Sequence, residues 1–264
     1  MRLDKKVILI TGSSTGIGKA MAQCFASEGA LLVITGLDVD LVAKTVEEIG
    51  SSRAVGQAED LLDDGAPDRL VKLAVETFGR LDSVVNNAAL IAQGNVHTTD
   101  AAFLTKMLAV NTVAPFLLIR AALPHLRKVR GSVLNIGSVN AWCGEPNLLP
   151  YSMSKGALMT MTRNLGDTLM REDGVRVNQI NPGWVLTENE TRRKQEHGLS
   201  AEWFRDLPKE YAPSGRILLP REIAVAAVYW LADESGPVSG QVMDLEQYPL
   251  IGRNPPKDTS TIPE

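Results

Sequence analysis

Short apolar runs alternate with stretches of helical periodicity along much of the chain. Val7 to Thr11 is a run of strand type, Ile17 to Glu28 has apolar residues at helical spacing, and Leu31 to Thr35 is a second run. Three later segments have the same strand character, each after a stretch long enough for a helix: Ser83 to Val85, Val133 to Ile136 and Val175 to Ile180. Nearly continuous apolar strands separated by helices predict an α/β fold, a doubly wound parallel sheet with helices on both faces.

One domain is expected over residues 1–252, because the sequence has no internal repeat, low-complexity segment or convincing linker. Asn181 to Arg216 is rich in charged residues, Pro and Trp and directly follows a strand, where open α/β sheets place their ligand crevice. We predict a mobile lid there, at about residues 184–215. Residues 253–264 contain three prolines and little to bury, which predicts a loosely ordered tail.

Composition narrows the class of partner. A formal net charge of −4 and the absence of a dense Lys or Arg run argue against nucleic acid or an anionic membrane, so a small soluble molecule is the expected partner. We find neither a signal-peptide pattern near Met1 nor an apolar run of membrane-spanning length. Cys24 and Cys143 are far apart and the three histidines are scattered, which favours a reducing cytoplasm and predicts no metal site.

A glycine-rich turn follows the first predicted strand and opens the first helix. Its residues are Thr11-Gly12-Ser13-Ser14-Thr15-Gly16-Ile17-Gly18. Glycines let the backbone turn sharply and approach a pyrophosphate, while free N–H groups and the helix dipole favour negative charge. We therefore predict a dinucleotide site that includes Gly12, Ser14, Gly16, Ile17 and Gly18; the alternative is a glycine-rich turn without a ligand.

This Gly-x-x-x-Gly-x-Gly spacing resembles the short-chain dehydrogenase/reductase family. Further motifs of that family follow in order: Asn86-Asn87-Ala88-Ala89, Asn111 in a helix, Ser138 after a strand, Tyr151-Ser152-Met153-Ser154-Lys155, and Asn181-Pro182-Gly183 with Thr187. The match runs from about Val7 to Asp244. The resemblance implies a sheet of about seven strands and an oxidoreductase that moves a hydride between NAD(P) and an alcohol or ketone.

The expected chemistry requires a base. When a hydride leaves an alcohol carbon, the hydroxyl proton must leave too. A tyrosine titrates near 10, but a nearby lysine cation favours its phenolate, and Tyr151 and Lys155 share one helix face because they are four residues apart. An exposed helical pair is the alternative for these two residues alone. By resemblance, Tyr151 is the acid/base, Lys155 activates it and binds the nicotinamide ribose, Ser138 holds the substrate oxygen, and Asn111 supports proton relay.

Other cofactor contacts rest on the same resemblance. Asp60 and Leu61 match the adenine-binding position, although Asp60 could instead cap a helix that begins at Leu61. Asn87 is expected to contact the cofactor, with a turn role as the alternative. Pro182 and Thr187 resemble the segment that closes over the nicotinamide and binds its carboxamide, although Thr187 could be an ordinary loop residue.

The coenzyme preference depends on the end of the second strand. Gly36 stands where NAD-preferring members carry an acid, and Leu37 where NADP-preferring members often carry arginine. Asp38 could accept bonds from the adenine ribose and repel a 2′-phosphate, so we predict NAD, with NADP as the alternative. Asp38 could equally be a surface residue of the next helix.

The sequence indicates the substrate and the assembly of the protein less directly than it indicates the cofactor. The segments after Ser138 and Gly183 should wall the pocket, and their polar and aromatic residues are Asn140, Trp142, Glu145, Asn147, Trp184, Glu188 and Asn189. Substrate contacts are predicted for Ser138, Asn140, Glu145, Asn147, Tyr151 and Trp184. Such a wall suits a sugar, sugar acid or polyol, because buried hydroxyls need partners; a simple ketone is the alternative if these residues face solvent or a neighbouring subunit.

Two other functions are alternatives to a dehydrogenase, and one segment of the sequence departs from the family's pattern. A nucleotide-sugar epimerase uses a similar Tyr and Lys pair but has another glycine pattern and a larger C-terminal domain; a dinucleotide-binding redox sensor would lack part of the catalytic set. The family's Asp-Gly-Gly is here Asp244-Leu245-Glu246, which leaves the end of the last strand and its subunit contacts open. By resemblance, helices over Ala101 to Leu126 and Tyr151 to Met170 would assemble a homodimer or homotetramer.

Overall fold

A parallel seven-stranded sheet forms the centre of the protein, as the computed structural model, which describes residues 1–250, shows. The strand order is β3-β2-β1-β4-β5-β6-β7. The strands are β1 (Val7–Ile10), β2 (Leu31–Gly36), β3 (Ala54–Ala58), β4 (Ser83–Asn86), β5 (Ser132–Ile136), β6 (Arg176–Pro182) and β7 (Val242–Leu245). This confirms the predicted α/β class and its seven strands. The predicted tail at residues 253–264 lies outside the described residues.

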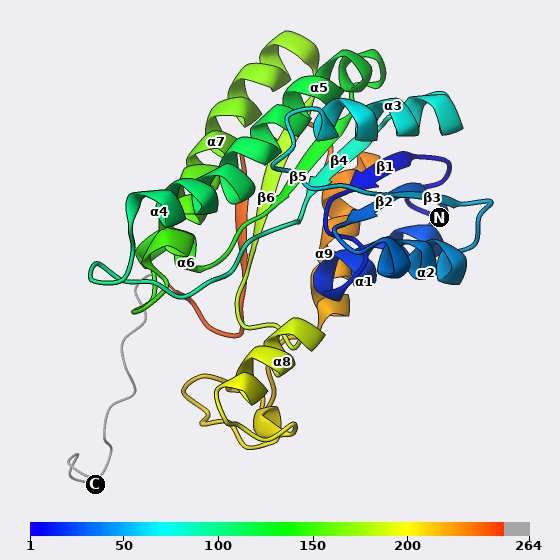
Figure 1. Ribbon diagram of the computed structural model, residues 1–264. Coiled ribbons are helices and arrows are strands. Elements are labelled where there is room, and N and C mark those ends of the chain that lie inside the picture. The colour runs from blue at the N-terminus through cyan, green and yellow to red at the C-terminus, as the bar shows by residue number, and fades with distance from the viewer. Residues whose placement is uncertain (251–264) are drawn as a thin grey trace, which may run out of the picture.

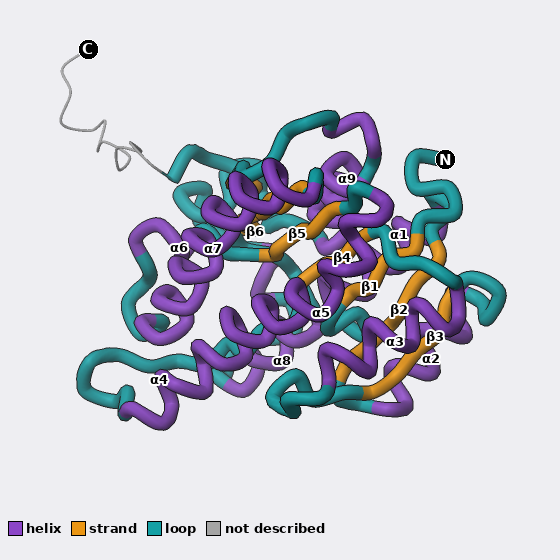
Figure 2. Tube along the Cα trace, turned by 90° about the horizontal axis from the view of Figure 1, so that it is seen from above, coloured by secondary structure: helices purple, strands orange, loops and turns teal. Residues whose placement is uncertain are grey.

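Helices cover both faces of the sheet (Figures 1 and 2). One face carries α1 (Gly16–Ser27), α2 (Val39–Ile49) and α9 (Pro220–Leu231), and the other α3 (Ala66–Phe78), α5 (Ala114–Val129) and α7 (Leu149–Asp173). Alternate residues of β1 divide between the two cores: Ile8 packs with the α1 and α9 side chains, whereas Leu9 packs with those of α3 and α5. Burial on both faces explains why β1 is continuously apolar.

Shorter elements complete the chain. They are α4 (Ala101–Leu108), a π-helical turn (Ala109–Val113), α6 (Asn140–Cys143), α8 (Glu188–Glu196) and two 3-10 turns (Trp203–Arg205 and Asp233–Ser235). The segment expected to be a lid, residues 184–215, follows β6 and contains α8. In Figure 1 it projects from the body of the molecule below the sheet.

Two local expectations differ from the structure. The sequence pattern did not single out β3, because this edge strand contains Gly56 and Gln57 and is buried fully only at Ala54. No helix begins at Leu61: α3 begins at Ala66, and Asp60 Oδ1 instead accepts the Leu62 N–H at 2.9 Å. The alternative that made Asp60 a helix cap was therefore wrong.

One apolar stretch is longer than expected. The helical segment Ala101–Val129 is long and apolar enough, by length and composition alone, to cross a membrane, which the sequence analysis did not anticipate. In the structure its inward-facing side chains, such as Leu118, Ala122 and Leu126, pack in the core beside the sheet. A helix that covers a sheet in an α/β core has the same composition, so this segment is explained by the fold in which it lies.

The order of the strands determines where a ligand can bind. β1 pairs with β2 on one side and with β4 on the other, so successive crossovers leave in opposite directions from this point. In open α/β sheets the crevice lies outside the carboxyl ends of the strands at such a switch point. The turns after β1, β4, β5 and β6 carry the glycine motif, Asn87, Ser138 and Thr187, respectively.

Candidate active site

The glycine turn is held rigidly between β1 and α1. Gly12 and Gly16 adopt positive φ values of 61° and 53°, which favour glycine. A Cβ on Gly18 would lie 2.2 Å from the Gly12 carbonyl oxygen, so only glycine permits this close packing. The Asn87 side chain donates to the carbonyls of Thr11 and Gly12 at 2.8 and 3.0 Å. Asn87 thus shapes the turn from the end of β4.

The turn has the properties of an anion site. The Glu188 carboxylate, from the first turn of α8, accepts the Gly16 N–H at 3.3 Å. A carboxylate therefore already lies at the N-terminus of α1, where the helix dipole and free N–H groups favour negative charge. The space next to Gly16 is open except for Thr187, whose Cγ2 lies 3.5 Å from a Cβ built on that glycine. These residues fit the pyrophosphate of a dinucleotide.

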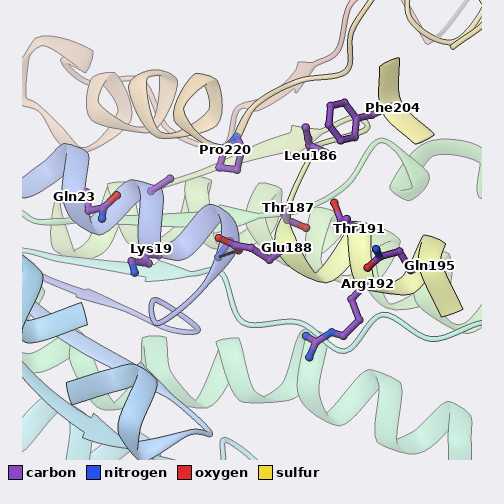
Figure 3. A pocket seen from close by; sticks show the side chains of 12 residues that line it. Lys19, Gln23, Leu186, Thr187, Glu188, Thr191, Arg192, Gln195, Phe204 and Pro220 are labelled. Atoms are coloured by element: carbon purple, nitrogen blue, oxygen red, sulfur yellow. Dashed lines mark hydrogen bonds between the residues drawn. The ribbon is translucent and has the colours of Figure 1, made fainter. Parts of the chain in front are cut away.

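A groove of about 600 Å³ lies between α1 and the lid segment (Figure 3). Lys19 and Gln23 line it from α1, and Thr191, Arg192 and Gln195 from α8. Figure 3 shows Glu188 reaching from α8 toward α1 at the centre of this groove. The lid segment and the glycine turn therefore meet through Glu188.

Tyr151 and Lys155 lie together on α7. Their side chains are almost fully buried, with 8% and 2% of the residue exposed. Lys155 Nζ lies 5.7 Å from the centre of the Tyr151 ring and donates to the Ile136 carbonyl at 2.8 Å. Because Ile136 ends β5, the lysine is tethered two residues before Ser138. The alternative of an exposed helical pair is therefore wrong.

Burial strongly shifts the pKa values of Tyr151 and Lys155. It raises the pKa of the Tyr151 phenol to about 12, and the hydrogen bond with Ser138 and the nearby Arg193 cation only partly offset the rise. It lowers the pKa of the Lys155 ammonium to about 7. In the protein without ligand, the phenol is therefore protonated at neutral pH, and Lys155 is close to its titration point. Such opposed shifts are typical of acid/base sites.

Asn111 joins three elements around this pair. It lies in the π-helical turn between α4 and α5 and is 1% exposed. Its Oδ1 accepts the Leu90 N–H at 2.7 Å, and its Nδ2 donates to the Leu90 carbonyl and to Ser154 Oγ, both at 2.9 Å. A π-bulge often marks a functional site. Asn111 thereby fixes the loop after β4 against α7, one residue before Lys155.

A second chain of hydrogen bonds supports Ser138. Asn181 Oδ1 accepts the Ser138 N–H at 3.1 Å, and Asn181 Nδ2 donates to Asp244 at 2.9 Å. Both Asp244 carboxylate oxygens accept the Trp142 indole N–H at 2.9 Å. The sequence analysis gave no role to Asp244. The available signal was a polar residue inside an otherwise apolar strand, since a buried amide such as that of Asn181 must find partners.

The predicted substrate residues separate into two places. Asn140, Glu145 and Asn147 line a cavity of about 680 Å³ beside α6 and the start of α7. Asn140 Nδ2 lies 3.5 Å from the Glu145 carboxylate, and the Asn140 N–H donates to Ser138 Oγ at 3.2 Å. The cavity thus begins next to Ser138, although neither Ser138 nor Tyr151 belongs to its lining.

Trp184 lies elsewhere. Its ring stacks on Trp203 at a centroid distance of 5.1 Å, and its indole N–H donates to Glu190 at 2.9 Å. Trp184 therefore belongs to the apolar cluster of the lid segment, not to the wall formed by Asn140 and Glu145. The two predicted wall segments thus lie apart in the structure, because the indole packs within its own loop, and a contact between Trp184 and substrate stays a prediction.

Two further features of the site concern the segment expected to bind the adenosine half of the cofactor and the possibility of a bound metal ion. Asp38 Oδ1 caps α2, accepting the N–H groups of Asp40 and Leu41 at 2.9 and 3.0 Å, while Leu37 is 76% exposed. Within residues 1–250, no three His, Cys, Asp or Glu side chains are grouped so as to hold a metal ion.

Known proteins resemble this chain over nearly its whole length. A family model described as enoyl-(acyl carrier protein) reductase matches residues 12–246. An uncharacterized oxidoreductase of Thermotoga maritima is 35% identical, with 93% of this chain and 98% of that protein covered. Meso-2,3-butanediol dehydrogenase of Serratia marcescens is 30% identical, with 91% and 92% covered. A solved 3-ketoacyl-(acyl-carrier-protein) reductase from Brucella melitensis, complexed with NADH, superimposes with a TM-score of 0.83 at 28% identity, covering 92% of this chain and 98% of that one.

The chain belongs to the short-chain dehydrogenase/reductase family. It is an oxidoreductase of the class that acts on alcohols and ketones with NAD(P). The predicted family, Rossmann-type fold and nicotinamide cofactor class are confirmed.

Proposed function

We propose that this protein oxidises a secondary alcohol, or reduces the corresponding ketone, with Tyr151 as the acid/base. The observation that supports this proposal is the buried Tyr151–Lys155 pair next to Ser138, with pKa values shifted in opposite directions. NAD(P), when bound at the glycine turn, supplies the hydride acceptor or donor.

The roles follow from the geometry. The Ser138 hydroxyl lies near enough to the Tyr151 phenol to lower its pKa, so an oxygen of the substrate that enters between them would contact both. In oxidation the phenolate of Tyr151 takes the hydroxyl proton, and in reduction the phenol donates it. Lys155, tethered to the end of β5, places its charge beside the phenol and favours the phenolate. Asn111 and Asn181 hold α7 and Ser138 in register.

Turnover is tested with purified protein, NAD or NADP, and a panel of alcohols and ketones, read at the nicotinamide absorbance. A dehydrogenase changes this absorbance in proportion to product. An epimerase would convert substrate without a net change, and a redox sensor would bind dinucleotide without turnover. Either result would contradict the proposal.

For the coenzyme, we propose a preference for NAD. No Lys or Arg stands within residues 36–40, and the Asp38 carboxylate would repel a 2′-phosphate. Other NAD-preferring members carry an acidic residue at the position of Gly36. Such a residue here would displace Ser14, because a Cβ at position 36 would lie 2.4 Å from Ser14 Oγ. Asp38 is thus the acid of this segment that remains near the ribose position.

A single change should shift this preference. We expect Leu37→Arg to raise kcat/KM for NADP by about tenfold relative to NAD, because an exposed guanidinium at this position would pair with the 2′-phosphate. Leu37→Gln is the control of similar length without charge. Steady-state kinetics with both coenzymes measure the ratio, and a wild-type protein that already prefers NADP would overturn the proposal.

For the substrate, we propose a sugar, sugar acid or polyol. Amide and carboxylate groups of Asn140, Glu145 and Asn147 line the cavity that begins next to Ser138, and Asn95 adds a further amide, bonded to Asn147 at 2.8 Å. Several hydrogen-bonding groups on one wall suit a polyhydroxylated molecule. The relative from Serratia marcescens, named for a diol, is in keeping with this class.

Removing these polar groups should weaken polyol binding. We expect Glu145→Ala and Asn147→Gly each to raise KM for the polyol by about threefold to tenfold with little change in kcat, since each removes a hydrogen bond to bound substrate. Glycine is chosen at 147 because the residue has a φ of 62°. Val96→Ala, at an apolar residue of the same cavity, is the control. Activity restricted to apolar alcohols, with both variants unaffected, would contradict the substrate class.

For assembly, we propose a homodimer or homotetramer formed through α5 and α7. Exposed apolar side chains on α5, on α7 and at the end of the preceding π-helical turn support this proposal: Val113, Phe116, Leu149 and Met153 are 41–47% exposed. We expect light scattering to give a multiple of 28.5 kDa, and Phe116→Glu to reduce the mass of the particle. A monomeric wild-type protein would contradict the proposal.

A further inference from the structure

Two consecutive side chains after β7 bind both ends of the lid segment. Glu246 Oε2 accepts the Trp184 N–H at 3.0 Å, where the segment begins. Gln247 Oε1 accepts the N–H and the hydroxyl of Ser214 at 3.0 and 2.6 Å, and Gln247 Nε2 donates to the Arg216 carbonyl at 2.7 Å, where the segment ends. The start and the end of the lid segment are therefore held from one point.

The lid segment has a narrow neck and its own apolar cluster. The neck is the place where Trp184 and Leu186 pair with Leu218. There the Leu186 N–H donates to the Leu218 carbonyl at 2.8 Å, and the Leu218 N–H donates to the Trp184 carbonyl at 3.0 Å. Further along, Trp203, Ala212 and Ile217 are buried together, with Trp184, Leu186, Phe204 and Leu207 packed against them. A loop with an internal cluster and a narrow neck moves as one body, so contacts at the neck control its position.

Glu246 occupies space that only a glycine at 183 leaves free. A Cβ on Gly183 would lie 1.6 Å from Glu246 Oε2, and the three nearest atoms all belong to Glu246. Gly183 does not have a positive φ, so its backbone alone would accept another residue. The Asp-Gly-Gly usual in the family would offer no side chain at position 246. The contact is thus a property of this chain's Asp244-Leu245-Glu246 sequence.

We propose that Glu246 and Gln247 clamp the neck of the lid segment and limit how far and how often it opens over the glycine turn, which it contacts through Glu188. They are positioning residues, and the inference rests on the proposed function only in that the cofactor bound under the segment would reach Ser138 and Tyr151. Each lost bond at the neck favours the open form by a factor of about two to ten. Loosening the clamp therefore weakens substrate retention and speeds product release, which often limits turnover in enzymes with lids.

The primary test measures motion and needs no substrate. Amide hydrogen exchange of the full-length wild-type protein is compared with that of Glu246→Gly and Gln247→Ala, with Glu76→Ala, on the outer face of α3, as the control. We expect exchange over residues 186–213 to be about tenfold faster in the two clamp variants and unchanged in α1, α9 and the central strands. Wild-type exchange rates in both variants would overturn the proposal.

A double-variant cycle tests the contact itself. Gly183→Ala should expel the Glu246 carboxylate and speed exchange of the lid segment as Glu246→Gly does. The combined variant should exchange no faster than either single variant, because both remove the same bond. Additive effects would show that the two residues act independently and would contradict the clamp.

Kinetic constants distinguish a clamp from a merely structural role of Glu246. With a substrate from the panel, Glu246→Gly should raise KM about threefold to tenfold while kcat is unchanged or higher and the melting temperature stays that of the wild type. A fall in kcat together with the melting temperature would show only a damaged fold. If the wild-type protein turns nothing over, the proposed function fails, whereas the exchange experiment still decides the clamp.

Discussion

Replacing Tyr151 by Phe should reduce turnover by at least about a hundredfold, the factor typical of a lost general acid/base. The variant removes one oxygen from a buried side chain whose ring packs against Leu148 and Met107, so the fold should persist. Dinucleotide affinity should remain nearly that of the wild type, because the glycine turn is built from β1, α1 and Asn87. The measurements are kcat with the best substrate of the panel and the dissociation constant for NADH by fluorescence.

Tyr211→Phe is the matched control, since Tyr211 lies in the lid segment and is 59% exposed. It removes the same phenolic oxygen at a place where no proton transfer is expected. Ser138→Ala should also reduce kcat, though less than Tyr151→Phe does, because it removes an anchor for the substrate oxygen and leaves the acid/base in place. Near-normal turnover in Tyr151→Phe would exclude the proposed mechanism.

Lys155→Met should likewise abolish most alcohol oxidation at neutral pH. Burial raises the pKa of Tyr151 to about 12, and Ser138 and the Arg193 cation offset this rise only in part, so loss of the Lys155 cation leaves the phenolate still less favoured. We expect a loss of about a hundredfold or more, with the remaining activity rising toward higher pH as the phenol deprotonates. The pH profile of kcat for oxidation, compared between wild type and variant, measures this shift. A variant profile that keeps the wild-type shape and height would contradict the role of Lys155.

The same substitution has a testable effect on stability. Folding lowers the pKa of Lys155 from 10.5 to about 7, so between these values the unfolded chain binds more protons than the folded one. The contribution of Lys155 to stability therefore improves as pH rises from 7 toward 10.5, and its cost is complete below pH 7. Thermal unfolding is measured at pH 6, 8 and 9.5. Across this range the free energy of unfolding of the wild type should rise, relative to that of Lys155→Met, by about 2 kcal/mol or more. Parallel curves would show that Lys155 titrates normally in the folded protein.

The sequence by itself determined the class of fold and predicted the reacting residues. Strands buried on both faces are rich in apolar residues, although β6 also buries Asn178 and Gln179, and helices show their period within a few residues, so local patterns were sufficient for β1, β4, β5, β6 and α1. The glycine turn, Ser138, Tyr151 and Lys155 were predicted from residue types and their order along the chain. Such features are local because a turn, a strand or a pair four apart on a helix needs only its own neighbours in sequence.

Tertiary structure decided everything that depends on residues far apart in the chain. The burial of Lys155, which lowers its pKa, and its bond to Ile136 arise only when α7 packs against β5. Trp184 lies apart from Asn140, Glu145 and Asn147 because it stacks on the buried ring of Trp203 within the lid segment. The support of Ser138 through Asn181 and Asp244 requires β6 beside β7. A hydrogen bond or a stacked pair forms only where the sheet brings its partners within a few ångströms, and no local pattern in the sequence records which distant partners those will be.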